Sequence, residues 1–450
     1  MAQTIISRRF QKEKEQQINA ETRVANLQAL KPTDEEKKNS DIVIRAITKK
    51  FGRMISMHGI TPELKAEIEA QVILEIEAIT KEYEAQSRLK KLVLDSMFGL
   101  GPLEIFMAPG SKVTDIIVQR YDNICIKDDK GTHKAEAEFN SEEHLRNVIS
   151  RIVQKVGRQI NIANPGVDAK LQDGSRIHAT IPPITPDGAT LTIRRFNTRK
   201  LDADDYLELG TLNEDMLEFL KFCVKNKISI LVAGGTDSGK TTLLNMLSSF
   251  IPQDELVVTI EDNCELQLRH PNVRRMEARQ STTEASDVTI QDLVRHSLRM
   301  CPDRIIVGEV RDGTVVDMLS AMSVGHEGSM STIHTDSPRS LVDSRLPTLF
   351  SQYSVQFSRE TQALMISAAV QLIVQVSICS DHKRRITHIT AVDGVDDVSG
   401  RVKLVDLFLY DKHDEKFICT KEEPEDLIKH FRDRGCDVEK VKDLLKLKGE

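Results

Sequence analysis

The chain has 450 residues, of which 40% are hydrophobic and 29% charged, and its formal net charge is −7. This length predicts two or three domains, and the composition is ordinary for a globular protein in water. The acidic balance disfavours a general DNA- or RNA-binding protein, because such proteins need a basic surface. We therefore expect no direct nucleic-acid partner.

Neither a targeting segment nor a membrane span is expected. The chain starts with residues that lead into charge rather than into the apolar core of a signal peptide. The longest nearly uncharged apolar stretch, 363–379, is shorter than the roughly 20 residues of a spanning helix, so it predicts buried core. The seven cysteines include no Cys-x-x-Cys pair, which indicates reduced thiols and no structural zinc site. We expect a cytoplasmic protein.

An N-terminal arm and a small helical module are predicted first. Residues 1–40 are polar and rich in Gln, Glu and Lys, which predicts a mobile or loosely helical arm. Over 41–98, apolar residues recur at three- and four-residue steps, which indicates two or three helices. Thr61 and Pro62 supply a cap and a first-turn proline for one of them. We expect this module to dock on a partner rather than to catalyse.

A mixed α+β domain is predicted over 99–204. Short runs with strand character at 113–118 and 123–127 precede a helical pattern at 141–158. Residues 205–450 form the second half, in which strand and helix signals alternate. Such alternation indicates a parallel sheet with crossover helices. From about residue 400 onward a further strand and a charged helix are expected, and no function is assigned to them.

The most specific motif is a phosphate-binding loop that follows the apolar run 228–233. Its spacing fits the G-x-x-x-x-G-K-[ST] template, and a helical pattern follows it. Glycines let successive backbone N–H groups converge on one anion, and a helix N-terminus adds to that positive field. The motif therefore predicts binding of a nucleoside triphosphate. The residues expected to bind it are Gly234, Gly235, Thr236, Asp237, Ser238, Gly239, Lys240, Thr241 and Thr242.

Within this loop, Lys240 is expected to reach the β- and γ-phosphates and the Thr241 hydroxyl to ligate Mg²⁺. Two further apolar runs end in acids: Glu309 closes 304–309, while Glu261 closes 256–261 and is followed by Asp262 and Glu265. Ligands of an open α/β sheet gather at the carboxyl ends of its strands. Alone, either acid would more often be a solvated strand end, but beside a phosphate loop they favour catalysis.

His326 and His334 flank a stretch of small residues. Their spacing suits no common metal site. A histidine near a γ-phosphate could instead report the nucleotide state through one hydrogen bond.

Taken together, these motifs resemble the secretion ATPases, which are hexameric motors of type II and type IV secretion and of type IV pili. The motif residues, in family order, are Gly-Gly-Thr-x-Ser-Gly-Lys-Thr-Thr, Thr-Ile-Glu-Asp-x-x-Glu-Leu, Leu-Arg-Met-x-Pro-Asp-Arg-Ile-Ile-Val-Gly-Glu-Val-Arg and Gly-His-Glu-Gly-Ser-x-Ser-Thr-Ile-His. The similarity runs from about residue 95 to about 395. The CpaF (TadA-type) ATPases of tight-adherence pili look nearest, since 99–104, 113–116 and 167–176 match that branch.

The resemblance implies an α/β fold: a RecA-like P-loop ATPase domain with a parallel sheet, preceded by an α+β N-terminal domain and a small helical module. It implies Lys240 and Thr241 as the Walker A pair and Glu309 as the Walker B acid, which could also hold Mg²⁺. It implies an Asp box at Glu261, Asp262 and Glu265 and a His box at His326 and His334.

The resemblance also implies nucleotide contacts from the N-terminal domain through Arg176, Arg194 and Arg195. These arginines could equally be surface groups paired with carboxylates. If they do reach the nucleotide, activation would require domain closure or subunit contact. A hexameric homo-oligomer is implied, held at the inner face of the membrane by platform proteins.

At Asp237, where the family usually has glycine, the sequence departs from the pattern. Asp tolerates a positive φ better than most residues. Two unit charges about 5 Å apart at an effective dielectric near 20 repel by roughly 3 kcal/mol, although a carboxylate pointing to solvent avoids most of this. The segment 376–381 also lacks an arginine that the family often carries.

The function expected is an ATP-hydrolysing motor for pilus assembly or protein export. One alternative is the ATPase of a conjugative type IV secretion machine, because these residues barely separate cargoes. Another, suggested by Asp237, is a nucleotide-binding scaffold that does not hydrolyse. A DNA-translocating motor is disfavoured by the acidic balance.

Overall fold

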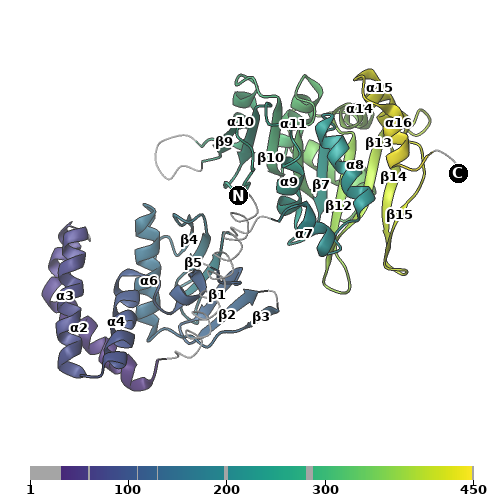
Figure 1. Cartoon of the computed structure of the whole chain (residues 1–450). Helices are drawn as coiled ribbons and strands as arrows, with labels where there is room; N and C mark the ends of the chain where they lie inside the picture. The colour runs from purple at the N-terminus through teal and green to yellow at the C-terminus, as the bar shows by residue number, and fades with distance from the viewer. Residues whose placement is uncertain are drawn as a thin grey trace. The chain divides into compact units, whose positions relative to one another are not determined.

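A computed structural model describes residues 32–447 of the chain apart from 59–60, 109, 129, 197–200 and 280–286. It divides into two compact units, Met1–Asn197 and Thr198–Glu450 (Figure 1). Most of the predicted polar arm falls outside the described residues. Among the residues described, every helix is too short or too polar to cross a lipid bilayer.

Three helices come first in the N-terminal unit, as the periodicity of 41–98 indicates. Their shared core includes Ile47, Ile68 and Val93. Thr61 caps the second helix by accepting a hydrogen bond from the Leu64 amide, with Pro62 in its first turn. The helices are α2 (Asp34–His58), α3 (Pro62–Ile79) and α4 (Tyr83–Phe98).

An antiparallel sheet of order β3-β2-β1-β6-β5-β4 makes up the rest of this unit. Helix α6 supplies Leu145, Val148 and Ile152 to the core that it shares with the sheet. The elements are η1 (Gly101–Leu103), α5 (Glu104–Met107), β1 (Asp115–Arg120), β2 (Asn123–Asp128), β3 (Gly131–Lys134), α6 (Glu142–Lys155), β4 (Gly166–Lys170), β5 (Arg176–Thr180) and β6 (Thr190–Arg194).

The second unit is built on a nine-stranded sheet of order β15-β14-β13-β12-β7-β11-β10-β8-β9. From β12 to β9 the pairings are parallel, whereas β13, β14 and β15 extend the sheet antiparallel. The tail therefore completes the sheet. The strands are β7 (Ile230–Gly234), β8 (Val257–Glu261), β9 (Val273–Glu277), β10 (Arg304–Val310), β11 (Met330–His334), β12 (Leu372–Ile378), β13 (Arg384–Val395), β14 (Val402–Asp411) and β15 (Lys416–Cys419).

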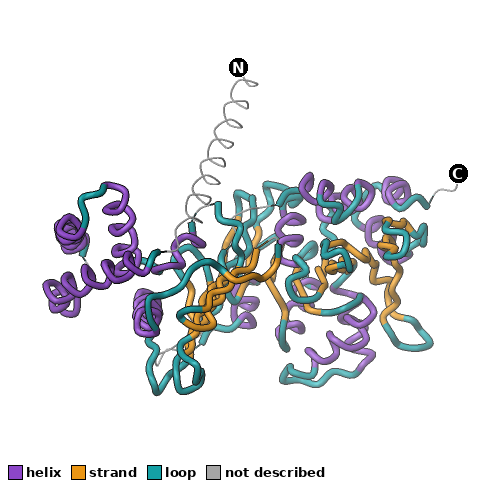
Figure 2. Tube along the Cα trace, turned by 90° about the horizontal axis from the view of Figure 1, so that it is seen from below, coloured by secondary structure: helices purple, strands orange, loops and turns teal. Residues whose placement is uncertain are grey.

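Helices cover both faces of this sheet (Figure 2). Side chains of successive strand residues point to opposite faces, so Ile230 and Val232 join one core, and Leu231 and Ala233 join the other. The first core is shared with α8, α9, α15 and α16, and the second with α10, α11, α13 and α14. A strand buried on both faces reads as a continuous apolar run, which is why 228–233 could be recognised.

The helical segments of this unit are α7 (Ala203–Glu208), α8 (Glu214–Lys225), α9 (Lys240–Ser248), α10 (Ile290–Ser297), α11 (Thr314–Ser323), α12 (Pro338–Ser340), η2 (Leu341–Arg345), α13 (Leu346–Phe350), α14 (Arg359–Ala369), α15 (Glu425–Asp433) and α16 (Val438–Leu444). The apolar stretch 363–379 divides between α14 and β12, and β12 is buried through Val376. The prediction of core rather than membrane span is thus confirmed.

One buried ion pair stabilises the end of the sheet at which β10 begins. Arg304 is fully buried, its guanidinium pairs with Glu255, and it also donates 2.7 Å to the Val224 carbonyl at the end of α8. Removing one partner of a buried pair leaves the other charge without compensation.

We expect Arg304→Ala to lower the free energy of unfolding by about 3–5 kcal/mol, because Glu255 would remain largely buried with only its 4.0 Å contact to Lys227. Denaturant unfolding at neutral pH measures this change. Arg299→Ala is the matched control, since Arg299 is exposed, and it should change the value by less than about 0.5 kcal/mol. Equal effects of the two substitutions would contradict the assigned role.

Candidate active site

The predicted phosphate loop joins the end of β7 to the start of α9. Two of its residues have left-handed backbone, Asp237 with a φ of 58° and Gly239 with a φ of 96°. Asp237 thus stands at a position that needs a positive φ, which Asp tolerates better than most residues. At Gly234 a Cβ atom would lie 2.3 Å from the Val376 carbonyl oxygen, so glycine is required by close approach of β12. Ser238 is buried, and its hydroxyl donates 2.9 Å to the Gly235 carbonyl.

Lys240 begins α9 and folds back over the loop. Its Nζ atom donates 2.7 Å to the Gly235 carbonyl and lies 3.4 Å from each ring nitrogen of His334. Burial lowers the pKa of Lys240, and Glu309 opposes that effect. Thr241 and Thr242 follow in the first turn of the helix. The ammonium group is therefore held at the mouth of the loop by two acceptors that a phosphate could replace.

His334 lies between Lys240 and Glu309. It ends β11, and its Nε2 atom is 3.0 Å from Glu309 Oε1 in β10. Burial lowers the pKa of His334, and the Lys240 charge lowers it further. Glu309 can only accept a proton in a hydrogen bond and Lys240 can only donate one. The two neighbours therefore favour a neutral imidazole that carries its proton on Nε2.

The second oxygen of Glu309 pairs with Arg311, which raises the pKa of that guanidinium. Arg311 also approaches Asp262, with 3.9 Å between Nη1 and Oδ2. Glu309 Oε1, by contrast, is buried and faces His334 Nε2 at 3.0 Å without the alignment of a hydrogen bond. A buried carboxylate oxygen in this state can accept a bond from a bound water.

Glu261, at the end of β8, is a buried acid beside this chain of charges. Its Oε2 atom accepts hydrogen bonds from the amides of Glu265 (2.7 Å) and Leu266 (2.8 Å). Burial raises the pKa of Glu261 to about 7, against the opposing effect of those two bonds. A Cβ atom on Gly308 would lie 2.9 Å from Glu261 Cγ, so β10 and the carboxyl are in close contact.

The two predicted histidines are not brought together. His326 precedes β11 and its Nδ1 atom lies 3.0 Å from the Pro302 carbonyl, whereas His334 ends the same strand. They therefore lie at opposite ends of β11, and only His334 is at the phosphate loop.

The three predicted arginines belong to the N-terminal unit. Arg176 and Arg194 are directly opposite each other in the pairing of β5 with β6. Arg195 donates to the carbonyls of Ser111 and Val113, both at 2.9 Å. Burial lowers its pKa. Their role toward the nucleotide stays a prediction.

Two arginines of this site were not assigned in advance. Arg311 follows Glu309 by two residues, and that spacing is a signal that could have been used. Arg384 begins β13 and donates 3.0 Å from Nε to the main-chain carbonyl of Asp237. It is 147 residues away from Asp237 in the chain, and no local pattern connects the two.

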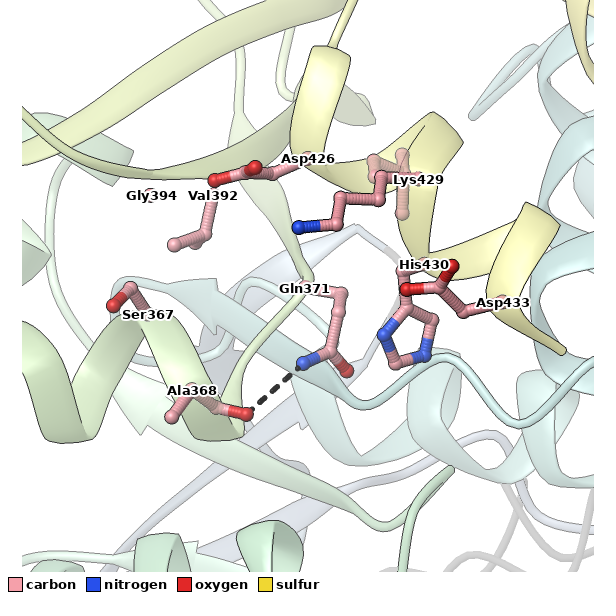
Figure 3. A pocket seen from close by; sticks show the side chains of 10 residues that line it. Ser367, Ala368, Gln371, Val392, Gly394, Asp426, Lys429, His430 and Asp433 are labelled. Atoms are coloured by element: carbon pink, nitrogen blue, oxygen red, sulfur yellow. Dashed lines mark hydrogen bonds between the residues drawn. The ribbon is translucent and has the colours of Figure 1, made fainter.

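A cavity of about 240 Å³ lies elsewhere in the second unit, among α14, β13 and α15 (Figure 3). Gln371 crosses it and is fixed by the Ser229 amide and the Ala368 carbonyl. None of the predicted site residues lines it.

The donor set at the loop fits Mg²⁺ bound together with phosphates. Among residues 32–447 as described, no cluster of three or more His, Cys, Asp or Glu could hold a metal ion. Mg²⁺ usually takes one or two protein oxygens and completes its shell with water and substrate phosphate. Thr241 and the hydrogen-bond-free oxygen of Glu309 are the groups that could supply such contacts.

Comparison with known proteins places this geometry in a family. The model of the family described as type II/IV secretion system protein matches residues 98–447. The chain belongs to this family. The predicted recognition as a secretion ATPase is confirmed at that level, and with it ATPase activity.

Two curated relatives illustrate the similarity. A putative conjugal transfer protein of Mycobacterium tuberculosis is 32% identical over 330 residues, which cover 72% of this chain and 92% of the relative. The VirB11 protein of Agrobacterium fabrum is 36% identical over 201 residues, covering 39% of this chain and 58% of the relative.

Two solved structures are also similar. The VirB11 ATPase of the Brucella suis type IV secretion system, in complex with sulphate, has a TM-score of 0.35 at 27% identity and covers 66% of this chain and 97% of its own. The pilus retraction motor PilT with bound ADP has a TM-score of 0.48 at 18% identity, covering 77% and 89%.

The raised pKa of Glu261 predicts a pH-dependent difference between the wild type and Glu261→Gln. Because the folded pKa lies above the ordinary value, the protonated carboxyl stabilises the fold at low pH, and this stability is lost as pH rises through about 7. In the nucleotide-free protein, Glu261→Gln should gain up to about 3 kcal/mol relative to wild type between pH 5 and pH 8.5.

Denaturant unfolding at both pH values measures this difference. Any cost of the substitution that does not involve ionisation is the same at both pH values and cancels. Parallel stability curves for the two proteins would contradict the assignment.

Proposed function

We propose that this secretion-family ATPase is a cytoplasmic motor that hydrolyses ATP at the 234–242 loop and uses the resulting change of shape in pilus assembly or protein export. The observation that carries the proposal is the convergence of Lys240, His334 and Glu309 at the mouth of the loop, with contacts of 3.4 Å and 3.0 Å between neighbours. A cation for the phosphates and a carboxylate for water are there within reach of one bound nucleotide.

In this mechanism the Lys240 ammonium exchanges the Gly235 carbonyl for the β- and γ-phosphates. Glu309 accepts a hydrogen bond from the attacking water, and Arg311 orients that carboxylate. His334, neutral and in contact with both Lys240 and Glu309, detects whether the γ-phosphate is present. Glu261 holds the 261–266 turn against β10.

Mg²⁺ would be held by Thr241 and, directly or through a water, by Glu309. When bound, it neutralises charge on the β- and γ-phosphates.

Work requires that hydrolysis at one site changes a contact between parts. We propose a hexameric ring in which Arg176 and Arg194 of the N-terminal unit reach a nucleotide, so that activation depends on closure. To do so, Arg194 would have to give up its 3.7 Å contact with Asp115, and Arg195 would have to give up its carbonyl bonds. Platform proteins at the inner face of the membrane would hold the ring, with the α2–α4 module as the docking surface.

The machine served is proposed to be a tight-adherence pilus, on the motif resemblance. The ATPase of a conjugative type IV secretion machine is the second candidate. It is favoured by the relative named as a putative conjugal transfer protein, nearly all of whose length this chain covers.

We expect the purified protein to release phosphate from Mg-ATP. Lys240→Ala should lower kcat at least about 10²-fold, because a charge-stabilising group is lost, and should also weaken ADP binding. Glu309→Gln should lower kcat as strongly with ADP binding unchanged. Chelation of Mg²⁺ should stop turnover of the wild type. A wild type without turnover, at concentrations where a ring forms, would favour the scaffold.

A chromosomal Lys240→Ala strain distinguishes the two machines. Loss of surface pili with unchanged plasmid transfer is expected, and the opposite pattern would establish the conjugative alternative. In the same strain, the ATPase should remain in the membrane fraction only while the platform genes are present. Release that is independent of those genes would contradict the proposed docking.

A further inference from the structure

The hairpin formed by β12 and β13 extends beyond the start of the phosphate loop. Gly234, the last residue of β7, is in register with Val376 of β12, and β12 continues to Ile378, which pairs with Arg384 at the start of β13. The end of the hairpin therefore projects beside the 234–242 loop, although the two are far apart in the sequence.

Arg384 is the residue through which the hairpin contacts the loop. Its Nε atom donates 3.0 Å to the main-chain carbonyl of Asp237, and its Cδ atom lies 3.3 Å from the position of a Cβ on Gly239. These are the two loop residues with positive φ. Within the described parts of the chain, the terminal guanidinium nitrogens of Arg384 show no hydrogen bond or ion pair.

The neighbouring residue fixes the direction in which Arg384 points. Arg385 is directed to the other face, where it makes two 2.7 Å bonds to Asp381 and lies 4.7 Å above the Tyr410 ring. Because side chains alternate along a strand, anchoring Arg385 leaves Arg384 on the face of the loop. The anchored side chain of Arg385 thus explains why Arg384 contacts the loop.

We propose that Arg384 is a positioning residue of the phosphate loop, which holds the left-handed turn at Asp237 and Gly239 and offsets the negative charge of Asp237. An aspartate adopts positive φ less readily than glycine does, and its carboxylate repels a polyphosphate. A hydrogen bond from a cation to the carbonyl of that same residue stabilises the turn and places the compensating charge beside it. The inference rests on the proposed nucleotide-binding function of the loop.

The full-length protein tests it with Arg384→Ala and a matched control, Lys383→Ala. Lys383 is exposed on the same hairpin, so the control removes an equal charge one residue away without touching the loop. Arg384→Ala should weaken ADP binding about five- to tenfold, with unchanged kcat at saturating ATP. Lys383→Ala should stay within about twofold, and both variants should unfold at the same denaturant concentration.

The same substitution in an Asp237→Gly background shows whether Arg384 acts through Asp237. Glycine adopts positive φ without strain and carries no charge, so Arg384→Ala should then weaken ADP binding less than twofold. An equal loss in both backgrounds would overturn the proposal, because Arg384 would then act on the nucleotide alone. Equal effects of Arg384→Ala and Lys383→Ala would overturn it too.

Hydrogen exchange of the loop amides in nucleotide-free protein separates this proposal from the function on which it rests. Arg384→Ala should speed exchange across 235–241, and Lys383→Ala should not. If the wild type bound no nucleotide, the proposed function would fail, while faster exchange would still establish that Arg384 holds the loop. Unchanged exchange in Arg384→Ala would contradict the proposal whatever the nucleotide does.

Discussion

The register of the parallel strands is the constraint on which the site depends. Gly234 of β7 lies opposite His334 of β11 and Val376 of β12, and β10 pairs with β8 so that Glu309 and Glu261 reach the same edge. A shift of one residue would exchange the faces of every side chain. Both faces of these strands are buried, so such a shift would disrupt the packing of both cores at once. The same burial that fixes the fold thus fixes which charged groups meet.

At that edge the charges alternate in sign, from Lys240 through neutral His334 to Glu309, Arg311 and Asp262. Each group satisfies its neighbour, which limits the cost of holding them partly buried. The arrangement is incomplete in two places: Lys240 rests on a main-chain carbonyl, and one oxygen of Glu309 has no hydrogen bond. Those are the places where a phosphate and a water would bind. The groups with unmet hydrogen-bonding capacity are therefore the ones that the proposed chemistry uses.

Local sequence patterns predicted much of the fold. The strand before the loop, the loop itself and the acid-ended strands are encoded within a few residues each, and the structure has them as β7, 234–240, β8 and β10. The separation of the histidines also has a local cause: His334 is the last residue of the five-residue strand β11, and His326 precedes that strand. The antiparallel extension by β13, β14 and β15 could not be predicted in this way, because the sequence of a strand does not specify which strands pair with it.

Arg384 shows most clearly what local sequence patterns cannot predict, and its contact with the loop changes the interpretation of Asp237. Considered alone, a carboxylate in the loop costs roughly 3 kcal/mol against a charge about 5 Å away, and that cost suggested a scaffold without hydrolysis as an alternative. In the structure, Asp237 comes with a guanidinium bonded to its own carbonyl. The positive charge of that guanidinium acts on the loop with the opposite sign to the carboxylate. The repulsion calculated for Asp237 alone therefore leaves out a cation that contacts the same residue, and it is a weak argument against hydrolysis.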